Sequence, residues 1–226
     1  MNNRRLAALS MLCALLLPWW PNVFVKTEVT ARAALTTVSF PSPTVIINEY
    51  LADPSSTAPN GDANGDGMNN TTQDEFVEIA NFGSLPLDVS GFTISDAAQV
   101  RFTIPAGKII PAGEAAVIFS GGTPIGNFGN AQANGLVFAV GGAGLSLNNA
   151  SDSIIIKTAA NLEVTRKDYP PPASDIDQSL TRSPDLTGDF VAHASAPGSV
   201  GLFSPGARAN GRPLVNDDPL IQVIAP

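Results

Sequence analysis

Apolar positions along the chain recur in short runs from Val45 onward, separated by clusters of Gly, Pro, Asn and Asp. No stretch keeps a helical period long enough for a stable helix. Short runs rich in β-branched and aromatic residues between turn signals predict strands, and several of them in succession predict a β-sandwich. The predicted strands are Val45–Leu51, Glu75–Asn81, Gly91–Ser95, Val100–Ile104, Ala115–Ser120, Leu136–Ala139, Ser153–Thr158 and Leu162–Tyr169.

Two of these strands have informative patterns. In Glu75–Asn81 the glutamates fall out of phase with the apolar residues, and we expect Phe76 and Ile79 to share an apolar face across a bend. The run Ser153–Lys157 is apolar on both faces, which is typical of a central strand.

The connections between strands also carry signals. Two Pro-x-Gly turns, Pro105–Gly107 and Pro111–Gly113, bound a short link at Lys108–Ile110. The Gly-rich stretch Ser120–Gly129 has no Lys after its glycines, so it does not fit a phosphate-binding P-loop and is predicted to be a long loop.

The N-terminus has the pattern of an export signal. Arg4 and Arg5 precede the apolar run Leu6–Trp20, and Ala31-Arg32-Ala33 offers small residues for cleavage before Ala34. Counted through Val25, the run approaches the roughly 20 residues of a membrane span, so an uncleaved anchor is the alternative. The protein is expected to be secreted, extracellular or part of the cell envelope, and to meet a membrane only if this signal is retained.

The expected organisation is a signal peptide or anchor at 1–33, a linker at 34–44, a β-sandwich at 45–212 and a tail at 213–226. The only cysteine, Cys13, lies in the signal. Cleavage would therefore leave no disulfide and no thiol chemistry.

Composition narrows the functional classes. The 226 residues carry a formal net charge of −8, with 14% charged and 44% apolar residues. So acidic a chain is poorly suited to bind nucleic acid by itself, because phosphates are bound through clustered Lys and Arg. The apolar content is enough for a packed core, so the chain is not expected to be disordered.

One acidic segment suggests a metal site. Between Ala34 and Val100 there is no Lys or Arg, and within this segment Asp62, Asn64 and Asp66 occupy alternate positions before Gly67. This is the start of an EF-hand-like loop, whose hard oxygens favour Ca²⁺. The twelfth position is Gln73 rather than Glu, so we expect the next residues, Asp74 or Glu75, to close the site. The alternative is a solvated acidic turn held by local hydrogen bonds.

Several motifs in order resemble the lamin-tail domain family in its bacterial, secreted form. They are Ile47-Asn48-Glu49, Asp74–Ile79 with Asn81, Leu87–Asp96, Leu145–Asn149 with Asp152-Ser153-Ile154, Gln178–Asp185, Gly188–Phe190, His193, Ser204–Gly206 and Asn210-Gly211. The resemblance implies an immunoglobulin-like β-sandwich that serves as an accessory or partner-binding module, in some proteins beside nucleases or phosphoesterases. Ser151 departs from the family's usual Gly in one turn.

Catalysis finds little support in the sequence. His193 is the only histidine, and no Gly-x-Ser-x-Gly elbow is present. Arg182 is interpreted either as a partner of Asp185 and Asp189 or as a group that binds a ligand carboxylate or phosphate.

Two functions follow from these patterns. The first is a non-catalytic exported module that binds a protein or cell-surface component through the long loops Pro54–Gln73, Gly121–Gly135 and Pro170–Asp177. The second is an accessory protein that acts in trans with a secreted nuclease or phosphoesterase.

Overall fold

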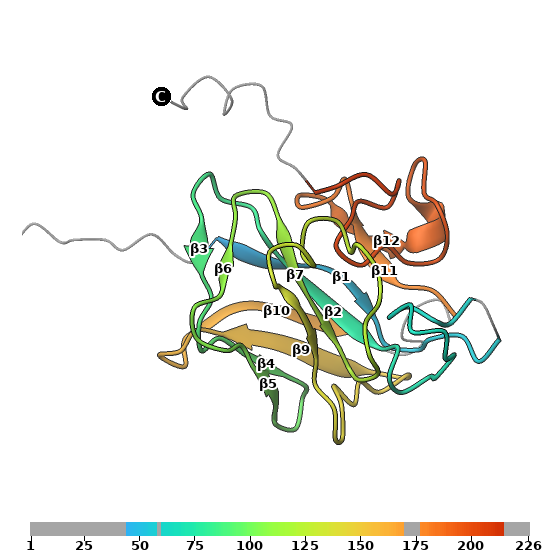
Figure 1. Cartoon of the computed structure of the whole chain (residues 1–226), viewed down its shortest axis with the longest axis horizontal. Helices are drawn as coiled ribbons and strands as arrows, with labels where there is room; N and C mark the ends of the chain where they lie inside the picture. The colour runs from blue at the N-terminus through green and yellow to red at the C-terminus, as the bar shows by residue number, and fades with distance from the viewer. Residues whose placement is uncertain (1–43, 58–59, 170–176, 215–226) are drawn as a thin grey trace, which may run out of the picture. The chain divides into compact units, whose positions relative to one another are not determined.

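The computed structural model describes residues 44–57, 60–169 and 177–214, all in the larger of two compact units, Phe40–Pro226. Across these residues the chain forms strands and one short 3-10 helix, with no α-helix (Figure 1). None of the described residues forms a helix with the length and apolarity needed to cross a membrane. The predicted signal at 1–33 lies outside the described residues, as do most of the linker and the tail.

Two sheets account for most of the strands. The larger has the order β12-β11-β1-β2-β7-β8, and the smaller has the order β10-β9-β4-β5. The bounds in the larger sheet are β1 Val45–Leu51, β2 Phe76–Asn81, β7 Ala115–Phe119, β8 Val137–Ala139, β11 Leu180–Ser183 and β12 Asp189–Ala192. Those in the smaller sheet are β4 Thr93–Ser95, β5 Val100–Thr103, β9 Asp152–Lys157 and β10 Glu163–Tyr169.

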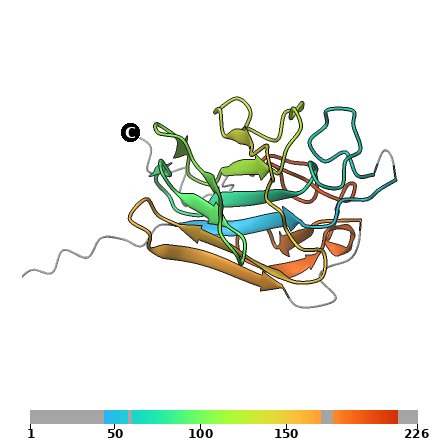
Figure 2. The ribbon, with the colours of Figure 1, turned by 90° about the horizontal axis from the view of Figure 1, so that it is seen from below.

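The sheets lie as separate layers, with β9 and β10 below β1 and β2 in the turned view (Figure 2). Their pairs are antiparallel except β7 with β8. Tyr50 of β1 and Tyr169 of β10 stack across the two layers with ring centroids 5.3 Å apart. This two-layer arrangement confirms the predicted all-β, immunoglobulin-like sandwich.

A β-bulge at Asn48 decides which side chains of β1 face the smaller sheet. Ile47 pairs with Ile79, but Glu49 pairs with Glu78, so one extra residue stands in β1. Directly opposed residues share a face of the sheet. The bulge therefore turns Tyr50 towards the smaller sheet and Glu49 to the opposite, outer face of the larger sheet.

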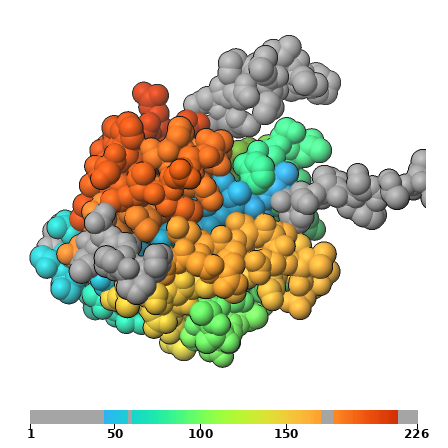
Figure 3. Space-filling view, turned by 180° about the vertical axis from the view of Figure 1, so that it is seen from behind, coloured from blue at the N-terminus to red at the C-terminus, as the bar shows by residue number. Residues whose placement is uncertain are grey.

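The outer face of the larger sheet is itself covered. All six residues of β2 are buried, and the residues that cover Glu49 and Glu78 come from the C-terminal segment 178–214. Figure 3 shows this segment as a thick orange-to-red layer beside the blue surface of β1. A strand covered on both faces needs no alternation of apolar and polar residues.

Val45–Leu51 is found with its predicted boundaries, the other seven predicted strands have boundaries shifted by one or two residues, and four further strands appear. Lys108–Ile110 was expected to be a link, but β6 (Ile109–Ile110) pairs there with β3 (Leu87–Asp88). The Pro-x-Gly turns on either side are confirmed, because Gly107 and Gly113 have φ of 77° and 74°. The other two new strands, β11 and β12, precede the 3-10 helix His193–Ser195.

The expected bend in β2 is wrong. Its pairing with β7 runs without a shift from Phe76↔Phe119 to Ala80↔Ala115. Phe76 and Ile79 therefore lie on opposite faces, and both are buried because both faces are covered. Ser153–Lys157, by contrast, lies in a strand between β10 and β4, which is the central position that its sequence predicts.

Candidate functional site

The acidic loop before β2 folds around its own side-chain oxygens. Asp62 Oδ2 accepts a hydrogen bond from Gly67 N at 2.9 Å, and Asn64 Oδ1 accepts one from Asp66 N at 3.0 Å. Asp66 Oδ1 accepts one from Met68 N at 2.9 Å. Gly67 has φ of 85°, the left-handed conformation that the sharp turn requires. The side chains of Asp62, Asn64 and Asp66 therefore accept local hydrogen bonds from the backbone of the same loop.

Of the two carboxylates that could close this loop, the structure places Asp74 beside it. Asp74 Oδ1 accepts a hydrogen bond from Asn64 N at 3.1 Å, and Oδ2 accepts one from Asn70 N at 2.7 Å. Burial raises the pKa of Asp74, these two N–H groups lower it, and the charges of Asp62 and Asp66 raise it further. Like charges disfavour the ionised form of a carboxyl, so Asp62 and Asp66 act on Asp74 in the same direction as burial.

Two side-chain oxygens of the loop have no donor among the described residues. Asp62 Oδ1 is buried and lacks a hydrogen-bond partner among the described residues, and so does Asn69 Oδ1. Across the described ranges, no group of three or more His, Cys, Asp or Glu side chains is arranged to hold a metal ion. An unpaired buried acceptor is costly, and a hydrated cation or a small local closure of the loop would satisfy it.

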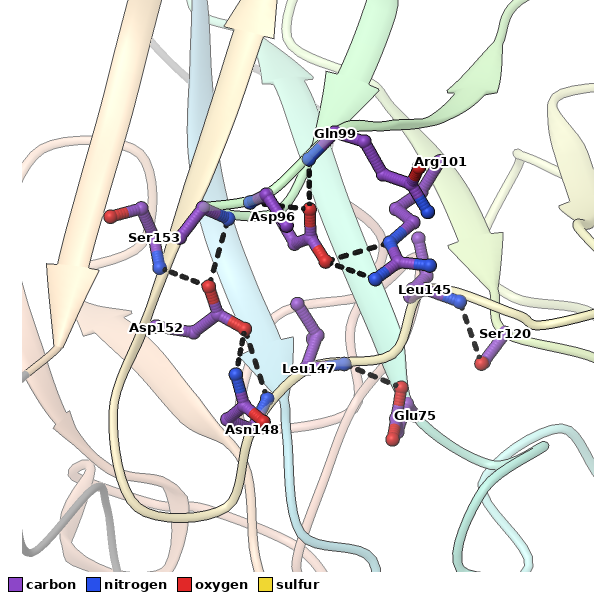
Figure 4. A network of polar contacts seen from close by, with 12 residues as sticks. Glu75, Asp96, Gln99, Arg101, Ser120, Leu145, Leu147, Asn148, Asp152 and Ser153 are labelled. Carbon is purple, nitrogen blue, oxygen red and sulfur yellow. Dashed lines mark hydrogen bonds and ion pairs between the residues drawn. The ribbon is translucent and has the colours of Figure 1, made fainter.

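Glu75 points away from this loop into a separate polar network (Figure 4). Its Oε2 accepts a hydrogen bond from Leu147 N at 3.1 Å, and burial raises its pKa to about 7. In the same network the Arg101 guanidinium pairs with Asp96, with Nε 2.7 Å from Oδ2. Glu75, directly before β2, thereby holds the 145–148 segment, and the Arg101–Asp96 pair joins β5 to the turn that follows β4.

Asp152 closes the turn in which Ser151 departs from the family pattern. Its Oδ2 accepts hydrogen bonds from the backbone and side-chain nitrogens of Asn148, both at 3.0 Å, and its Oδ1 accepts one from Ala97 N at 2.9 Å. The carboxylate of Asp152 therefore holds this turn closed with Ser, rather than Gly, at position 151.

Two fully buried carboxyls form a pair on the outer face of the larger sheet. Glu49 and Glu78 lie directly opposite each other on β1 and β2, and both are 0% exposed. Their hydrogen bonds come from Ser179, Ser204, Gly206 and Asn48. Both carboxyls are therefore occupied in holding the C-terminal segment.

The family comparison fits this arrangement. The family described as Lamin Tail Domain matches residues 39–170, which include every strand from β1 to β10. The chain belongs to the lamin tail domain family. No curated protein matches the sequence. In this lamin tail domain β11 and β12 lie beyond the matched stretch, yet they extend the larger sheet beside β1.

Arg182 of the lamin tail domain makes structural contacts. Its Nε donates to Ile47 O at 2.8 Å, and its Nη1 donates to Gly188 O at 2.7 Å. Its guanidinium lies 4.6 Å from the centre of the Phe190 ring. The expected pairing with Asp185 is not among these contacts, and the charge of Asp189 acts on Arg182 only at longer range. Ile47 precedes the bulge at Asn48, so Arg182 satisfies a carbonyl beside the bulge.

His193 is positioned as a structural residue. It is 0% exposed, and neither ring nitrogen has a hydrogen-bond partner among the described residues. Burial lowers its pKa, which favours the neutral ring.

Sequence reasoning missed the Glu49–Glu78 pair. The signal was present, because Glu78 stands between Val77 and Ile79 in a strongly apolar strand. Its burial could not be predicted, because the C-terminal segment that covers it was not predicted.

Proposed function

We propose that this lamin tail domain is a non-catalytic module that acts outside the cytoplasm and binds a protein or cell-surface component through two loops. The loops are 60–73 and 121–129, which together we call the loop face. The family is one of immunoglobulin-like modules, and the carboxylates and the histidine described above are occupied in structural contacts or buried. Binding through loops on a rigid sandwich fits such a molecule.

The observation that carries the proposal is that the two loops are fastened to each other. Gly121 N donates to Gln73 O at 3.0 Å, and Ile125 N donates to Asn64 O at 2.8 Å. Thr123 N donates to Asp66 Oδ2 at 3.1 Å. Loops held in this way lose little conformational entropy when they bind a partner.

The loop face also offers contact groups. The side chains of Met68 and Ile125 are 67% and 62% exposed. Neither loop contains Lys or Arg, whereas Asp62 and Asp66 lie at the edge of the face. This combination favours a partner with apolar and basic groups, and it disfavours nucleic acid. The third loop expected to take part, Pro170–Asp177, lies outside the described residues except for Asp177.

Removal of the two apolar side chains should weaken partner binding. We expect Met68→Ser with Ile125→Ser to reduce binding to the cell-envelope fraction of the producing cell by about tenfold or more, since exposed apolar anchors contribute most of the affinity of an interface. The measurement is a quantitative pull-down with purified protein. The matched control is Leu162→Ser with Val200→Ser, at side chains 66% and 65% exposed outside the loop face. Equal binding by both double variants would contradict the proposal.

We also propose that Ca²⁺ stabilises the first loop. Asp62, Asn64, Asp66 and Asp74 supply oxygen atoms of the kind that Ca²⁺ prefers, and Asp62 Oδ1 is buried without a donor. Bound there, the ion would neutralise repulsion among carboxylates that no Lys or Arg of the loop offsets. Glu75, which is bonded to Leu147 N, is not part of this proposed site.

The proposed Ca²⁺ site predicts a change in thermal stability. Millimolar Ca²⁺ should raise the melting temperature by several degrees relative to chelator, since ligand at 100 times Kd adds about 2.7 kcal/mol. Asp62→Asn with Asp66→Asn should abolish the difference, and Asp88→Asn, outside the loop, should retain it. Superimposable melts of the unaltered protein, with no heat in calorimetric titration, would support the solvated acidic turn.

A further inference from the structure

The segment 199–209 of this domain lies over two buried carboxyls. Glu49 and Glu78 share the outer face of β1 and β2, because they are directly opposed in register. The bulge at Asn48 is what brings Glu49 to that face beside Glu78. Two acidic side chains on adjacent strands thus meet where the sheet is covered rather than solvated.

The segment is attached through both carboxyls. Ser204 donates to Glu49 twice, from N to Oε1 at 2.8 Å and from Oγ to Oε2 at 2.6 Å. Gly206 N donates to Glu78 Oε2 at 2.6 Å. Ser179 Oγ, at 2.6 Å from Glu49 Oε1, and Asn48 Nδ2, at 2.8 Å from Glu78 Oε1, complete the contacts.

None of the groups that are hydrogen-bonded to Glu49 and Glu78 carries a positive charge that would neutralise the pair. The five hydrogen bonds all come from neutral groups, and the opposed residues on the neighbouring strands, Val117 of β7 and Thr181 of β11, are neutral as well. Asp185 lies in the turn between β11 and β12. Its charge raises the pKa of both glutamates, as does their mutual repulsion.

The cationic side chains on the elements that pack against the pair interact with other groups. Arg182 of β11 bonds the carbonyls of Ile47 and Gly188, and the charge of Arg208, on the covering segment, acts on Asp185. His193 follows β12, and its pKa is lowered by burial, which favours the neutral ring. These elements therefore leave the two carboxyls with mainly acidic neighbours.

The hydrogen bonds are compatible with a protonated pair. The hydroxyls of Ser179 and Ser204 can either donate to a carboxylate or accept from a carboxylic acid. Ser179 Oγ also lies 3.3 Å from Leu202 O, so it has a second acceptor for its hydrogen when it accepts from Glu49. Ionisation of both carboxyls would place two like charges face to face in a site without water contact.

We propose that Glu49 and Glu78 form a pH-sensitive clamp, which holds segment 199–209 against β1 and β2 while the pair carries a proton and loosens it when both carboxyls ionise. Burial raises the pKa of Glu49 to about 7 and, together with the charge of Glu49, raises that of Glu78 well above its usual range. Loosening is therefore expected on the alkaline side of neutrality, and it would uncover the outer face of the larger sheet.

Amide hydrogen exchange of the full chain tests the clamp. Between about pH 6 and about pH 9, after correction for intrinsic rates, protection of amides in 199–209 should fall by about tenfold or more. Amides of β9 should keep their protection. Unchanged protection of 199–209 across this range would overturn the proposal.

Glu49→Gln provides the matched variant. Its amide oxygen can accept from Ser204 N while its amide nitrogen donates to Ser204 Oγ, so the attachment survives without a charge. Protection of 199–209 should then change by less than about threefold. Glu163→Gln, at a side chain 46% exposed on β10, should behave like the unaltered protein. A Glu49→Gln protein with the original pH dependence would overturn the clamp.

Titration of the unaltered protein keeps the proposal testable if Glu49→Gln fails to fold. Carboxyl-carbon NMR should show Glu49 and Glu78, in addition to Glu75, titrating near or above neutrality. Titration of both Glu49 and Glu78 below about pH 5.5 would overturn the clamp.

Discussion

The stability of this lamin tail domain should fall as the pH rises from about 5 to about 8, which is opposite to ordinary acid denaturation. Folded Glu49 holds its proton up to about pH 7, whereas unfolded glutamate releases it near 4.5. Between these values the folded state binds more protons than the unfolded state, so the free energy of unfolding decreases with pH. The contribution is complete below 4.5 and lost above the folded pKa.

The expected change in the free energy of unfolding is large for a single domain. A pKa shift from 4.5 to about 7 at Glu49 corresponds to about 3 kcal/mol. Glu78 and Glu75, whose pKa values burial also raises, act in the same direction. Asp88 and Asp168, whose pKa values are lowered through hydrogen bonds from Ser90 and Ser153, act only in more acidic solution.

Urea unfolding at a series of pH values measures this dependence. Glu49→Gln should reduce the slope between about pH 5 and about pH 8, and Glu163→Gln should leave it unchanged. A stability that rises steadily across the same range would show that these carboxyls are ionised in the folded protein.

Removal of Arg182 should destabilise the domain by about 3 kcal/mol. Arg182→Ala leaves Ile47 O and Gly188 O without their side-chain donor and removes the guanidinium from the Phe190 ring. Arg182→Lys should recover little of this stability, because one ammonium group does not reproduce a planar fork with two anchored nitrogens.

Chemical denaturation checks the prediction for Arg182. Arg166→Ala, at a side chain 41% exposed on β10, is the control and should cost less than about 1 kcal/mol. An Arg182→Ala protein with full stability would contradict the structural role and favour the alternative in which this arginine binds a ligand.

Most of the sandwich was predictable because its strands are local apolar runs between turn signals. Val45–Leu51 was predicted with the boundaries that β1 has. Two of the strands that were missed, β11 and β12, have mixed polar sequences, and they extend the sheet only because β11 pairs with the distant β1 and β12 pairs with β11. A bulge such as that at Asn48 leaves no mark in composition, and the face of the sheet on which Glu49 lies depends on it.

In the acidic loop, too, local features were predictable from the sequence, whereas features that depend on distant residues were not. Alternate oxygen-bearing residues before Gly67 predicted a Ca²⁺ loop or an acidic turn held by local hydrogen bonds, and Asp62, Asn64 and Asp66 accept such local hydrogen bonds. Sequence left open whether Asp74 or Glu75 lies beside the loop. Adjacent residues entering a strand point to opposite faces, so the answer depends on how the loop meets β2 and on Leu147, a residue far along the chain.

The loop face is tested most directly by amide hydrogen exchange of the protein alone and bound to the cell-envelope component that it captures. Our account predicts new protection in 60–73 and 121–129, with little change in 180–192. Protection centred on Arg182 and Phe190, with the two loops unchanged, would contradict it.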